Sequence, residues 1–364
     1  MIFTLVSANL THRPVRTALS IAAIALEVTM ILTLVGVSYG TLDESARRAR
    51  GVGADLLVRP PGTSILSLSS APMPDTLLDF VAHQPHVALV AGTAVQPLSG
   101  FDTVTGIDLD ALSRMSGGFH FIEGGPFKAP NDVLLDEYYA REHHLHPGSW
   151  VQLMGRTWHV AGIFESGKLA RICVQLPVLG EITGNPHRLS QIYIKSDDPS
   201  HNREILDALH THMPGYQIYT MEEFISLLTI NNVGMLRNFI GVVIGVATIV
   251  GFLAVFMSIY TAVLERTREI GILKALGASS SFIAGLLVRE TLLLALLGSA
   301  AGIGLTYVTQ WLIHTLSPAS LTQETVYLWW PIATGIAVVG ALLGVVVPVT
   351  KALRQDATEA LSYE

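Results

Sequence analysis

The sequence predicts a membrane protein with four transmembrane α-helices and a large α+β domain inserted between helices 1 and 2. Its composition is the first indication, because 50% of the residues are hydrophobic and only 14% are charged, whereas soluble domains carry about 25% charged residues. Four apolar stretches reach the roughly 20 residues that a helix needs to cross a bilayer. They cover residues 17–39, 237–263, 282–312 and 329–350.

The segment 40–236, between the first two stretches, has the composition of a folded domain. Short apolar runs bounded by Gly, Pro and Asp, such as ADLLVRPPG, SWVQLMGRTWHVAGIF and QIYIKSDDP, predict β-strands. Residues 74–83, 132–144 and 199–212 are expected to be helices. Residues 43–50 and 221–234 predict helices that lead out of the first span and into the second, as a stalk. A segment of this size is able to bury a hydrophobic core.

The orientation follows from positive charge, because short loops rich in Lys and Arg stay in the cytoplasm. Such residues lie in three segments: 1–16 (Arg13, Arg16), 264–281 (Arg266, Arg268, Lys274) and 351–364 (Lys351, Arg354). We therefore predict cytoplasmic termini, with 40–236 and the loop 313–328 on the other side. The first span is expected to be an uncleaved anchor. For the amphipathic residues 1–16, a helix lying on the membrane face and an ordinary flank both remain open.

No group of residues predicts catalysis. GIFESGK at 162–168 matches the start of a P-loop, but Leu169 replaces the hydroxyl residue that would reach magnesium, so a loop between two strands is expected. Glu142, His143, His144 and His146 follow one another too closely to converge on a metal, and a solvated loop is expected there. Cys173 lies between two β-branched residues, which predicts a buried, inert thiol. We therefore predict a non-enzymatic chain that binds no metal.

Polar residues and glycines inside the spans are the next candidates. Glu27 and Glu290 lie in apolar stretches, where a carboxylate is costly unless it faces other helices or water. For Glu27, a role in packing and a role in a transport cycle both remain open. Three GxxxG pairs, one in each of the last three spans, predict close helix packing. These pairs are Gly241 and Gly245, Gly298 and Gly302, and Gly340 and Gly344.

Between the second and third spans, a helix-favouring segment carries both charged and apolar residues. Gly277 is suited to end this helix in a left-handed conformation, and the serines from Ser279 to Ser281 are suited to cap the next one. Such a helix is suited to receive force from a soluble partner, although a plain loop whose charges only fix the orientation remains open. The candidate coupling residues are Glu265, Arg266, Arg268, Glu269, Ile270, Gly271, Leu273, Lys274, Leu276 and Gly277.

This segment, ERTREIGILKALGAS, resembles the one that joins the second and third spans of MacB/FtsX-type ABC transporter permeases. RETLLLALLGSAAGIGL is similar to the third span of that family, with Glu290 at the usual acidic position. PVTKALRQDATEALSYE resembles its closing pattern, and ANLTHRPVRTALSIAAIAL its opening. GADLLVRPPGTS is similar to the start of its exported domain. The C-terminal motifs are the specific ones.

The resemblance implies four spans, a periplasmic MacB-like domain, a bacterial inner-membrane location, and a dimer with a second copy or a paralogous permease. It implies that the coupling segment docks on a cytoplasmic ABC ATPase. Since the chain shows no Walker A motif ending in Ser or Thr, that ATPase is expected to be a separate subunit, which binds ATP and Mg, while this chain binds no cofactor. A periplasmic adaptor or acceptor and membrane lipids are the other expected partners. The net charge of −7 argues against nucleic acid.

The function that the resemblance implies is mechanotransmission: ATP hydrolysis in the partner moves the exported domain and drives export or extraction of a lipid, lipoprotein or other amphiphile. The alternative is a membrane regulator that activates a periplasmic partner, such as a cell-wall hydrolase, and transports nothing.

Overall fold

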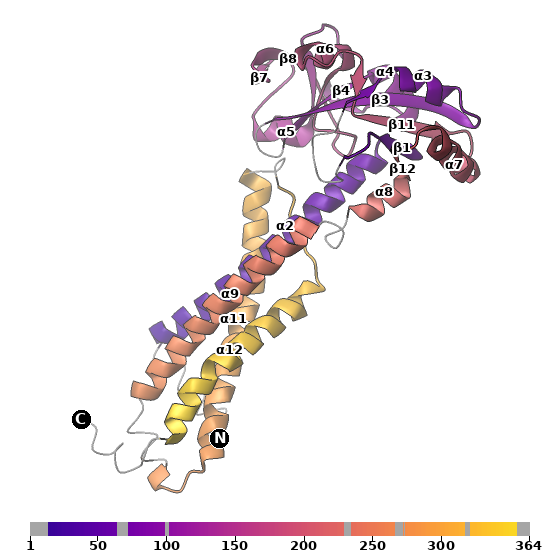
Figure 1. The fold of residues 1–364 in the computed structure, drawn as a ribbon. Helices are drawn as coiled ribbons and strands as arrows, with labels where there is room; N and C mark the ends of the chain where they lie inside the picture. Colours follow the sequence, from indigo (N-terminus) through magenta and orange to yellow (C-terminus); the bar gives the residue numbers. More distant parts are fainter. Residues whose placement is uncertain are drawn as a thin grey trace. The chain divides into compact units, whose positions relative to one another are not determined.

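The computed structural model describes residues 14–63, 72–98, 102–228, 234–265, 272, 274–316 and 321–354 (Figure 1). The chain divides into two compact units. The helical unit consists of Met1–Ser38, Met235–Leu312 and Gln323–Glu364, and the domain consists of Tyr39–Gly234 with Ile313–Thr322.

Within the described ranges, four helices are long and apolar enough to cross a membrane. They are α2 (Pro14–Arg50), α9 (Gly234–Glu265), α11 (Ser280–Leu316) and α12 (Trp329–Arg354). The four predicted spans are confirmed. α2 and α11 have 37 residues each, and at ~1.5 Å per residue such helices exceed the roughly 30 Å hydrocarbon core.

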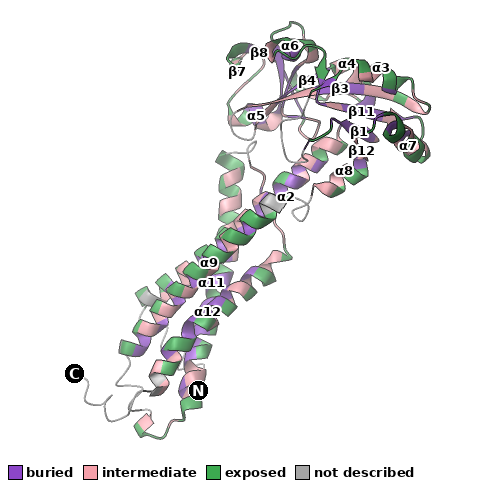
Figure 2. Ribbon diagram, viewed as in Figure 1, coloured by how far each residue is buried: buried purple, intermediate pink, exposed green. Residues whose placement is uncertain are grey.

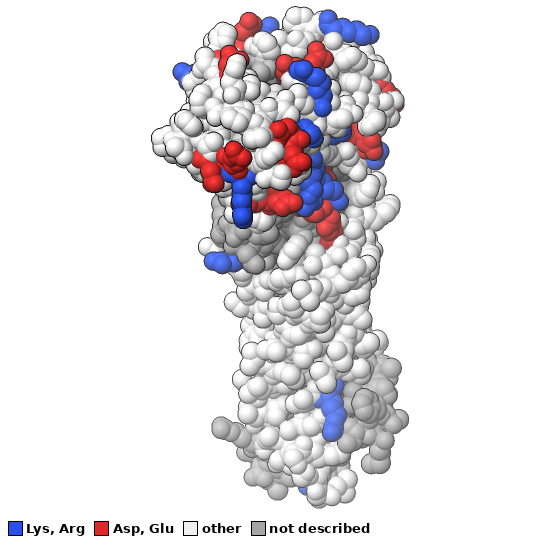
Figure 3. Space-filling view, turned by 90° about the vertical axis from the view of Figure 1, so that its right-hand side faces the viewer, with Lys and Arg blue, Asp and Glu red and all other residues white. Residues whose placement is uncertain are grey.

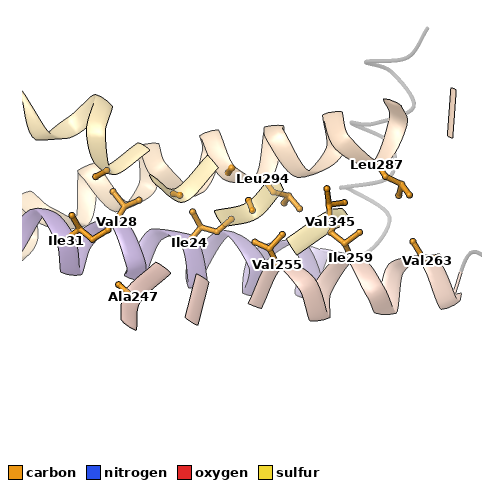
Figure 4. Close-up of a cluster of buried hydrophobic side chains, with 14 of the residues drawn as sticks. Ile24, Val28, Ile31, Ala247, Val255, Ile259, Val263, Leu287, Leu294 and Val345 are labelled. Carbon is orange, nitrogen blue, oxygen red and sulfur yellow. The ribbon is translucent and has the colours of Figure 1, made fainter. Parts of the chain in front are cut away.

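The four helices meet along one apolar core, part of which is drawn in Figure 4. Ile24, Val28 and Ile31 of α2 lie in it with residues of the other three helices. The further members include Ala247, Val255, Ile259, Val263, Leu287, Leu294, Ala333, Ala337, Ala341 and Val345. On α12, small residues recur every fourth position, which places them on one face and lets neighbouring backbones approach closely.

The helices of the helical unit have exposed sides (Figure 2), and many of the residues exposed there are large and apolar. α9 carries a row of exposed apolar side chains that includes Val242, Val246, Ile249, Leu253 and Met257. In Figure 3, Lys, Arg, Asp and Glu gather on the domain, while the visible face of the helices carries very few. A continuous apolar surface of this kind suits lipid or another transmembrane subunit.

The domain is built on a mixed ten-stranded sheet of order β12-β1-β11-β3-β4-β9-β6-β8-β5, with β7 paired to β8. Among the strands of the described residues, only the pairs β4–β9 and β6–β8 are parallel. The strands are β1 (Leu56–Arg59), β3 (Val87–Pro97), β4 (Thr103–Ile107), β5 (Phe121–Gly124), β6 (Asp132–Asp136), β7 (Trp150–Leu153), β8 (Arg156–Phe164), β9 (Ile172–Gln175), β11 (Gln191–Ser196) and β12 (Gln217–Thr220). A second, two-stranded sheet pairs β2 (Met73–Pro74) with β10 (Arg188–Leu189).

Short helices cover this sheet. Among them, α3 and α4 contact β3, α6 contacts β4, and α7 contacts β12. The helices are α3 (Thr76–Ala82), α4 (Leu109–Ser116), α5 (Glu137–Glu142), α6 (Leu176–Ile182), η1 (Pro199–His201), α7 (Asn202–His212) and α8 (Met221–Leu227). Trp158 of β8 is fully buried, and its indole N–H donates to the Leu153 carbonyl over 3.1 Å. The predicted α+β domain, inserted after the first span, is therefore confirmed.

Two local predictions were wrong. Residues 132–144 do not form one helix, because Asp132–Asp136 is strand β6, buried along its whole length between β8 and β9. The helix begins only where the Asp136 carboxylate accepts from the Tyr139 amide over 2.7 Å. In the predicted helix 221–234, α8 ends at Leu227; residues 229–233 lie outside the described ranges.

Candidate coupling site

The candidate coupling segment is described only at its ends. Arg266, Arg268, Glu269, Ile270, Gly271 and Leu273 lie outside the described residues. Helix α9 ends at Glu265, and the described residues before α11 include Ile272 and, among the other candidates, Lys274, Leu276 and Gly277.

The end of this segment has the geometry that its sequence predicts. The Gly277 amide donates to the Lys274 carbonyl over 2.9 Å, and Gly277 has a φ of 90°. This left-handed conformation ends the turn without the steric penalty that a side chain would meet. The Ser279 hydroxyl accepts from the Phe282 amide over 3.3 Å at the start of α11. Leu276 is 80% exposed, so an apolar side chain projects from the turn.

Two lysines connect the segment, α12 and α9. The Lys274 ammonium donates to the Leu353 carbonyl over 2.9 Å, in the last turn of α12, where helix carbonyls attract cations. The Lys351 ammonium donates to the Tyr260 hydroxyl over 2.7 Å and lies 4.5 Å from the centre of that ring. The end of the coupling segment therefore contacts α12 directly and α9 through it.

Glu27 packs against a glycine that sequence reasoning did not select. The Glu27 side chain is 4% exposed, and a Cβ added at Gly251 of α9 would overlap with its Oε2 atom. The carboxylate thus occupies space that only glycine leaves free. This contact supports the packing role that the sequence left open. Glu290 is also buried, at 2% exposed, within α11.

Two of the three glycine pairs lie at helix contacts inside this chain. An added Cβ would lie 2.6 Å from the Ile24 Cβ at Gly298, and 2.7 Å from the Ala25 carbonyl oxygen at Gly302. On α12, an added Cβ would lie 3.5 Å from Thr248 Cγ2 at Gly340 and 3.0 Å from the Phe252 carbonyl oxygen at Gly344. Gly241 and Gly245 meet no other atom within 4 Å in the described part, so packing at that pair stays a prediction.

Hydroxyl groups add contacts between α2 and its neighbours. The Thr29 hydroxyl donates to the Gly302 carbonyl over 3.0 Å, and the Thr33 and Thr309 hydroxyls are 2.9 Å apart. Thr29 and Thr33 lie one turn apart on α2, and both therefore face α11. Sequence reasoning missed them, although their four-residue spacing within an apolar run was a usable signal.

Within the domain, the loop that includes the end of the P-loop-like segment 162–168 packs against the last turn of α2 and the residue after it. β8 ends at Phe164 and β9 begins at Ile172, so the expected loop between two strands is confirmed. The Leu169 amide donates to the Arg48 carbonyl over 3.1 Å, and a Cβ added at Gly51 would overlap with the Gly167 carbonyl oxygen. The Lys168 ammonium donates to the Ser116 and Gly118 carbonyls. This lysine is thus held by protein oxygens.

Two buried carboxylates and two half-buried arginines lie at the same junction. The Arg48 Nε atom lies 3.9 Å from the Glu44 Oε1 atom within α2, and Arg171 Nε lies 3.9 Å from Asp136 Oδ2. Burial raises the pKa of Asp136 to about 6, even though the Tyr139 amide and Arg171 stabilise its charged form. Sequence reasoning took this part of α2 for a simple charged helix and missed the buried partners on β6 and in the loop.

The structure also shows the surroundings of His143, His146 and Cys173, which the sequence singled out. His143 stacks on Tyr139, with the ring centres 4.1 Å apart, and His146 Nδ1 lies 3.5 Å from a Glu123 oxygen. Cys173 is fully buried in β9, and burial raises the pKa of its thiol, as expected of an inert residue. The structure brings together a different set, His86, Asp197 and His201, which sequence spacing did not reveal.

Two family models match the chain. The FtsX-like permease C-terminal model matches residues 241–357, and the MacB-like periplasmic core domain model matches residues 17–211. The chain belongs to the MacB/FtsX-type family of ABC transporter permeases. The resemblance stated from the sequence is thereby confirmed. A member of this family with four membrane-spanning helices is a multi-pass inner-membrane protein.

Curated relatives agree with this assignment. The permease is 24% identical to the macrolide export ATP-binding/permease protein MacB of Escherichia coli over 97% of its own length and 59% of the relative. It is 31% identical to the uncharacterized ABC transporter permease YknZ of Bacillus subtilis over 44% of its length and 40% of that chain. An uncharacterized ABC transporter permease of Mycobacterium tuberculosis is 26% identical over 80% of this chain and 82% of the relative. The permease thus spans about three-fifths of the MacB relative.

Solved structures give weaker likenesses. The periplasmic region of MacB from Actinobacillus actinomycetemcomitans is 16% identical, with a TM-score of 0.38 over 48% of this chain and 92% of that one. The extracellular domain of YknZ from Gram-positive bacteria is 15% identical, with a TM-score of 0.36 over 46% of this chain and 100% of that one.

The candidate residues of the permease fall in different family-model matches. The FtsX-like match contains Lys274, Gly277, α11 and the hydrogen bond from Lys351 to Tyr260. The junction at Gly51 and the buried Asp136 fall in the MacB-like match. β12 and α8 lie between the two matches.

Proposed function

We propose that the permease is the membrane subunit of a transporter whose ATPase is a separate chain, and that hydrolysis drives export or extraction by mechanotransmission. The observation that carries this proposal is α2. It is one helix from Pro14 to Arg50, apolar enough to span the membrane, and its last turns are hydrogen-bonded and tightly packed to the loop before β9. A stiff helix that belongs to both the span and the domain is suited to carry displacement between them.

The ATPase would bind at the coupling segment between α9 and α11, and would hold ATP and Mg²⁺ itself. The exposed Leu276 offers an apolar contact to such a partner. The contact from Lys274 to Leu353 would pass displacement of the segment to α12, and the contact from Lys351 to Tyr260 would pass it to α9. In this arrangement both termini are cytoplasmic and the domain is periplasmic.

A second permease copy or a paralogue would complete the transporter. The exposed apolar face of α9, with Gly241 and Gly245 beside Val242 and Val246, offers the flat surface that transmembrane helices use to associate. The periplasmic domain would meet an adaptor or acceptor protein.

The substrate we propose is a lipid, lipoprotein or other amphiphile. The relative in Escherichia coli is named for macrolide export, and macrolides are large and mostly apolar. A transporter that works by moving a domain outside the membrane needs no polar pathway through the bundle. This agrees with a helical unit whose core, in the described residues, consists mainly of aliphatic side chains.

Two substitutions test the coupling segment. Lys274→Glu would replace a cation at the α12 carbonyl end by an anion, which that end repels. Gly277→Val would place a β-branched residue at a φ of 90°, at a cost of roughly 1–2 kcal/mol or more. We expect both variants to insert into the membrane at normal levels and to lose at least tenfold in substrate-stimulated ATP hydrolysis, measured with the ATPase in lipid.

Two matched variants control for charge and for side-chain volume. Lys128→Glu makes the same reversal on the domain surface, and Gly304→Val makes the same replacement in α11, where an added Cβ meets no atom of the described residues within 4 Å. With either control variant, the partner ATPase is expected to hydrolyse ATP at the wild-type rate. Normal hydrolysis in Lys274→Glu and Gly277→Val would contradict the assignment of this segment. A third outcome is also informative. If ATP hydrolysis depends on the coupling segment, but the domain binds a cell-wall hydrolase and no lipid is bound, the permease is a regulator and not a transporter.

A further inference from the structure

Three potential metal ligands meet at one end of the β3–β11 strand pair. His86 directly precedes β3, Asp197 directly follows β11, and His201 ends the short helix η1. One ligand atom from each of the three lies within 4.8 Å of the other two. The His86 and His201 Nδ1 atoms face different oxygens of Asp197, over 3.0 and 2.9 Å. The carboxylate therefore lies between two imidazoles.

The backbone holds these residues in place before any ligand arrives. The Asp197 amide donates to the His86 carbonyl over 3.0 Å, next to the paired strand residues Val87 and Ser196. The Asp198 carboxylate accepts from the Ser200 amide over 2.8 Å, which fixes the start of η1. The ion pairs found for Asp197 in the described residues are both with histidine. No lysine or arginine therefore neutralises this carboxylate in that part of the structure.

We propose that His86, Asp197 and His201 form a binding site for a divalent transition-metal ion of the zinc type. Two imidazole nitrogens and one carboxylate oxygen are ligands that Zn²⁺ prefers, and a water molecule would complete a tetrahedron. In such a tetrahedron, with metal–ligand bonds of ~2.0–2.1 Å, neighbouring ligand atoms are about 3.3 Å apart. The two N···O distances are only a few tenths of an ångström shorter than this.

The neighbouring carboxylate of Glu204 fits a supporting role. Its Oε2 atom lies 3.9 Å from His86 Nε2, on the side of the ring away from Asp197. A metal at Nδ1 leaves the ring proton on Nε2, where a carboxylate that accepts this proton orients the imidazole and raises its basicity. A neutral imidazole carries one proton, which can sit on either nitrogen. When that proton sits on Nε2, the metal binds the free Nδ1 and the ring loses no proton.

Binding requires one local movement. The two imidazole rings are stacked, with centres 3.7 Å apart and planes inclined by 30°, whereas an ion must lie close to the plane of each ring that binds it. The rings must therefore rotate apart. His86 and His201 are about one-third exposed, and the terminal torsion of histidine is broad, so rotation toward a shared ion does not disturb the core.

A second histidine–aspartate pair of the domain supplies a matched comparison. His187 Nδ1 lies 2.9 Å from the Asp75 Oδ2 atom, and His187, like His86, has a positive φ. No third His, Cys, Asp or Glu of the described residues joins this pair within ligand distance. It therefore has the hydrogen bond of the proposed site without the set of ligands.

The test uses the full chain in detergent, purified without a histidine tag, stripped with chelator and dialysed against buffered micromolar Zn²⁺. We expect the wild type to bind one Zn²⁺ per chain more than His201→Gln or His86→Gln, with affinity at the site at least tenfold weaker in both variants. His187→Gln should bind as the wild type does. As a second measurement, Zn²⁺ should raise the thermal midpoint of the wild type and of His187→Gln, because a ligand of the native state stabilises it.

The outcomes separate a metal site from a simple hydrogen-bonded cluster. If His201→Gln and His86→Gln lower the midpoint without Zn²⁺, but the wild type binds no more Zn²⁺ than they do, the residues form only a structural network and the proposal is wrong. Equal loss of Zn²⁺ in His187→Gln would show surface binding by histidines in general, which would also overturn it. The proposal is independent of the ATPase partner.

Discussion

Replacing Gly302 by leucine is expected to break the packing of α11 on α2. An added Cβ would lie 2.7 Å from the Ala25 carbonyl oxygen and 2.8 Å from the Val28 Cβ, closer than atoms in a packed core approach. The backbone of α2 cannot yield without losing the hydrogen bond from Thr29 to the Gly302 carbonyl. Overpacking of this kind costs about 1–3 kcal/mol and occasionally more, and we expect a loss of at least ~2 kcal/mol.

The measurement is unfolding of the purified permease in mixed micelles as the fraction of denaturing detergent rises. Gly304→Leu is the control, because it makes the same change two residues along the same helix, where no atom in the described part of the chain lies within 4 Å of an added Cβ. We expect this control to match the wild type or exceed it slightly, since leucine favours helix more than glycine does. Equal stability of the two variants would show that α11 does not pack on α2 through Gly302.

The second large effect is expected at the junction within the domain. Gly51 follows the last turn of α2, and a Cβ there would overlap with the Gly167 carbonyl oxygen, which is backbone and cannot rotate away. Gly51→Ala should therefore force the loop off the helix end and weaken the hydrogen bond from the Leu169 amide to the Arg48 carbonyl. We expect a loss of about 2–3 kcal/mol in unfolding free energy, in the upper range for overpacking.

Thermal unfolding and limited proteolysis of the loop at 165–171 measure this effect. Gly125→Ala is the matched control, because Gly125 also lies in the domain and an added Cβ there has no atom within 4 Å among the residues that the structure describes. The direction is informative, because alanine usually stabilises a chain relative to glycine by reducing the entropy of its unfolded state. A stabilised Gly51→Ala variant would contradict the close approach of α2 and the loop.

The spans and the class of the domain were predictable because they depend on local composition. An apolar run of sufficient length specifies a transmembrane helix whatever it contacts, and strand runs bounded by turn residues specify a sheet. The strand at Asp132–Asp136 was mistaken for part of a helix because it is buried along its whole length. A buried strand lacks the alternation of apolar and polar residues that identifies a half-buried one.

Contacts between distant residues were not predictable from one sequence. Gly298 and Gly302 were recognised as packing residues, but the helix that they contact follows only from the fold. Nothing in the sequence pairs Glu27 with Gly251. His86 and Asp197 are 111 residues apart and meet only because β3 and β11 are neighbours in the sheet. The sequence instead suggested the adjacent residues His143 and His144 as the histidines to consider for a metal.

We propose that an ABC ATPase binds this permease as a separate subunit, and isolation of the intact complex is the most direct test. The full chain should be tagged, extracted from its own cells in mild detergent, and analysed for bound proteins and ATP hydrolysis in lipid. We expect an ABC ATPase in stoichiometric amount, lost in the Gly277→Val variant and retained in Gly304→Val. A permease that is isolated without any ATPase, with and without nucleotide, would contradict the account.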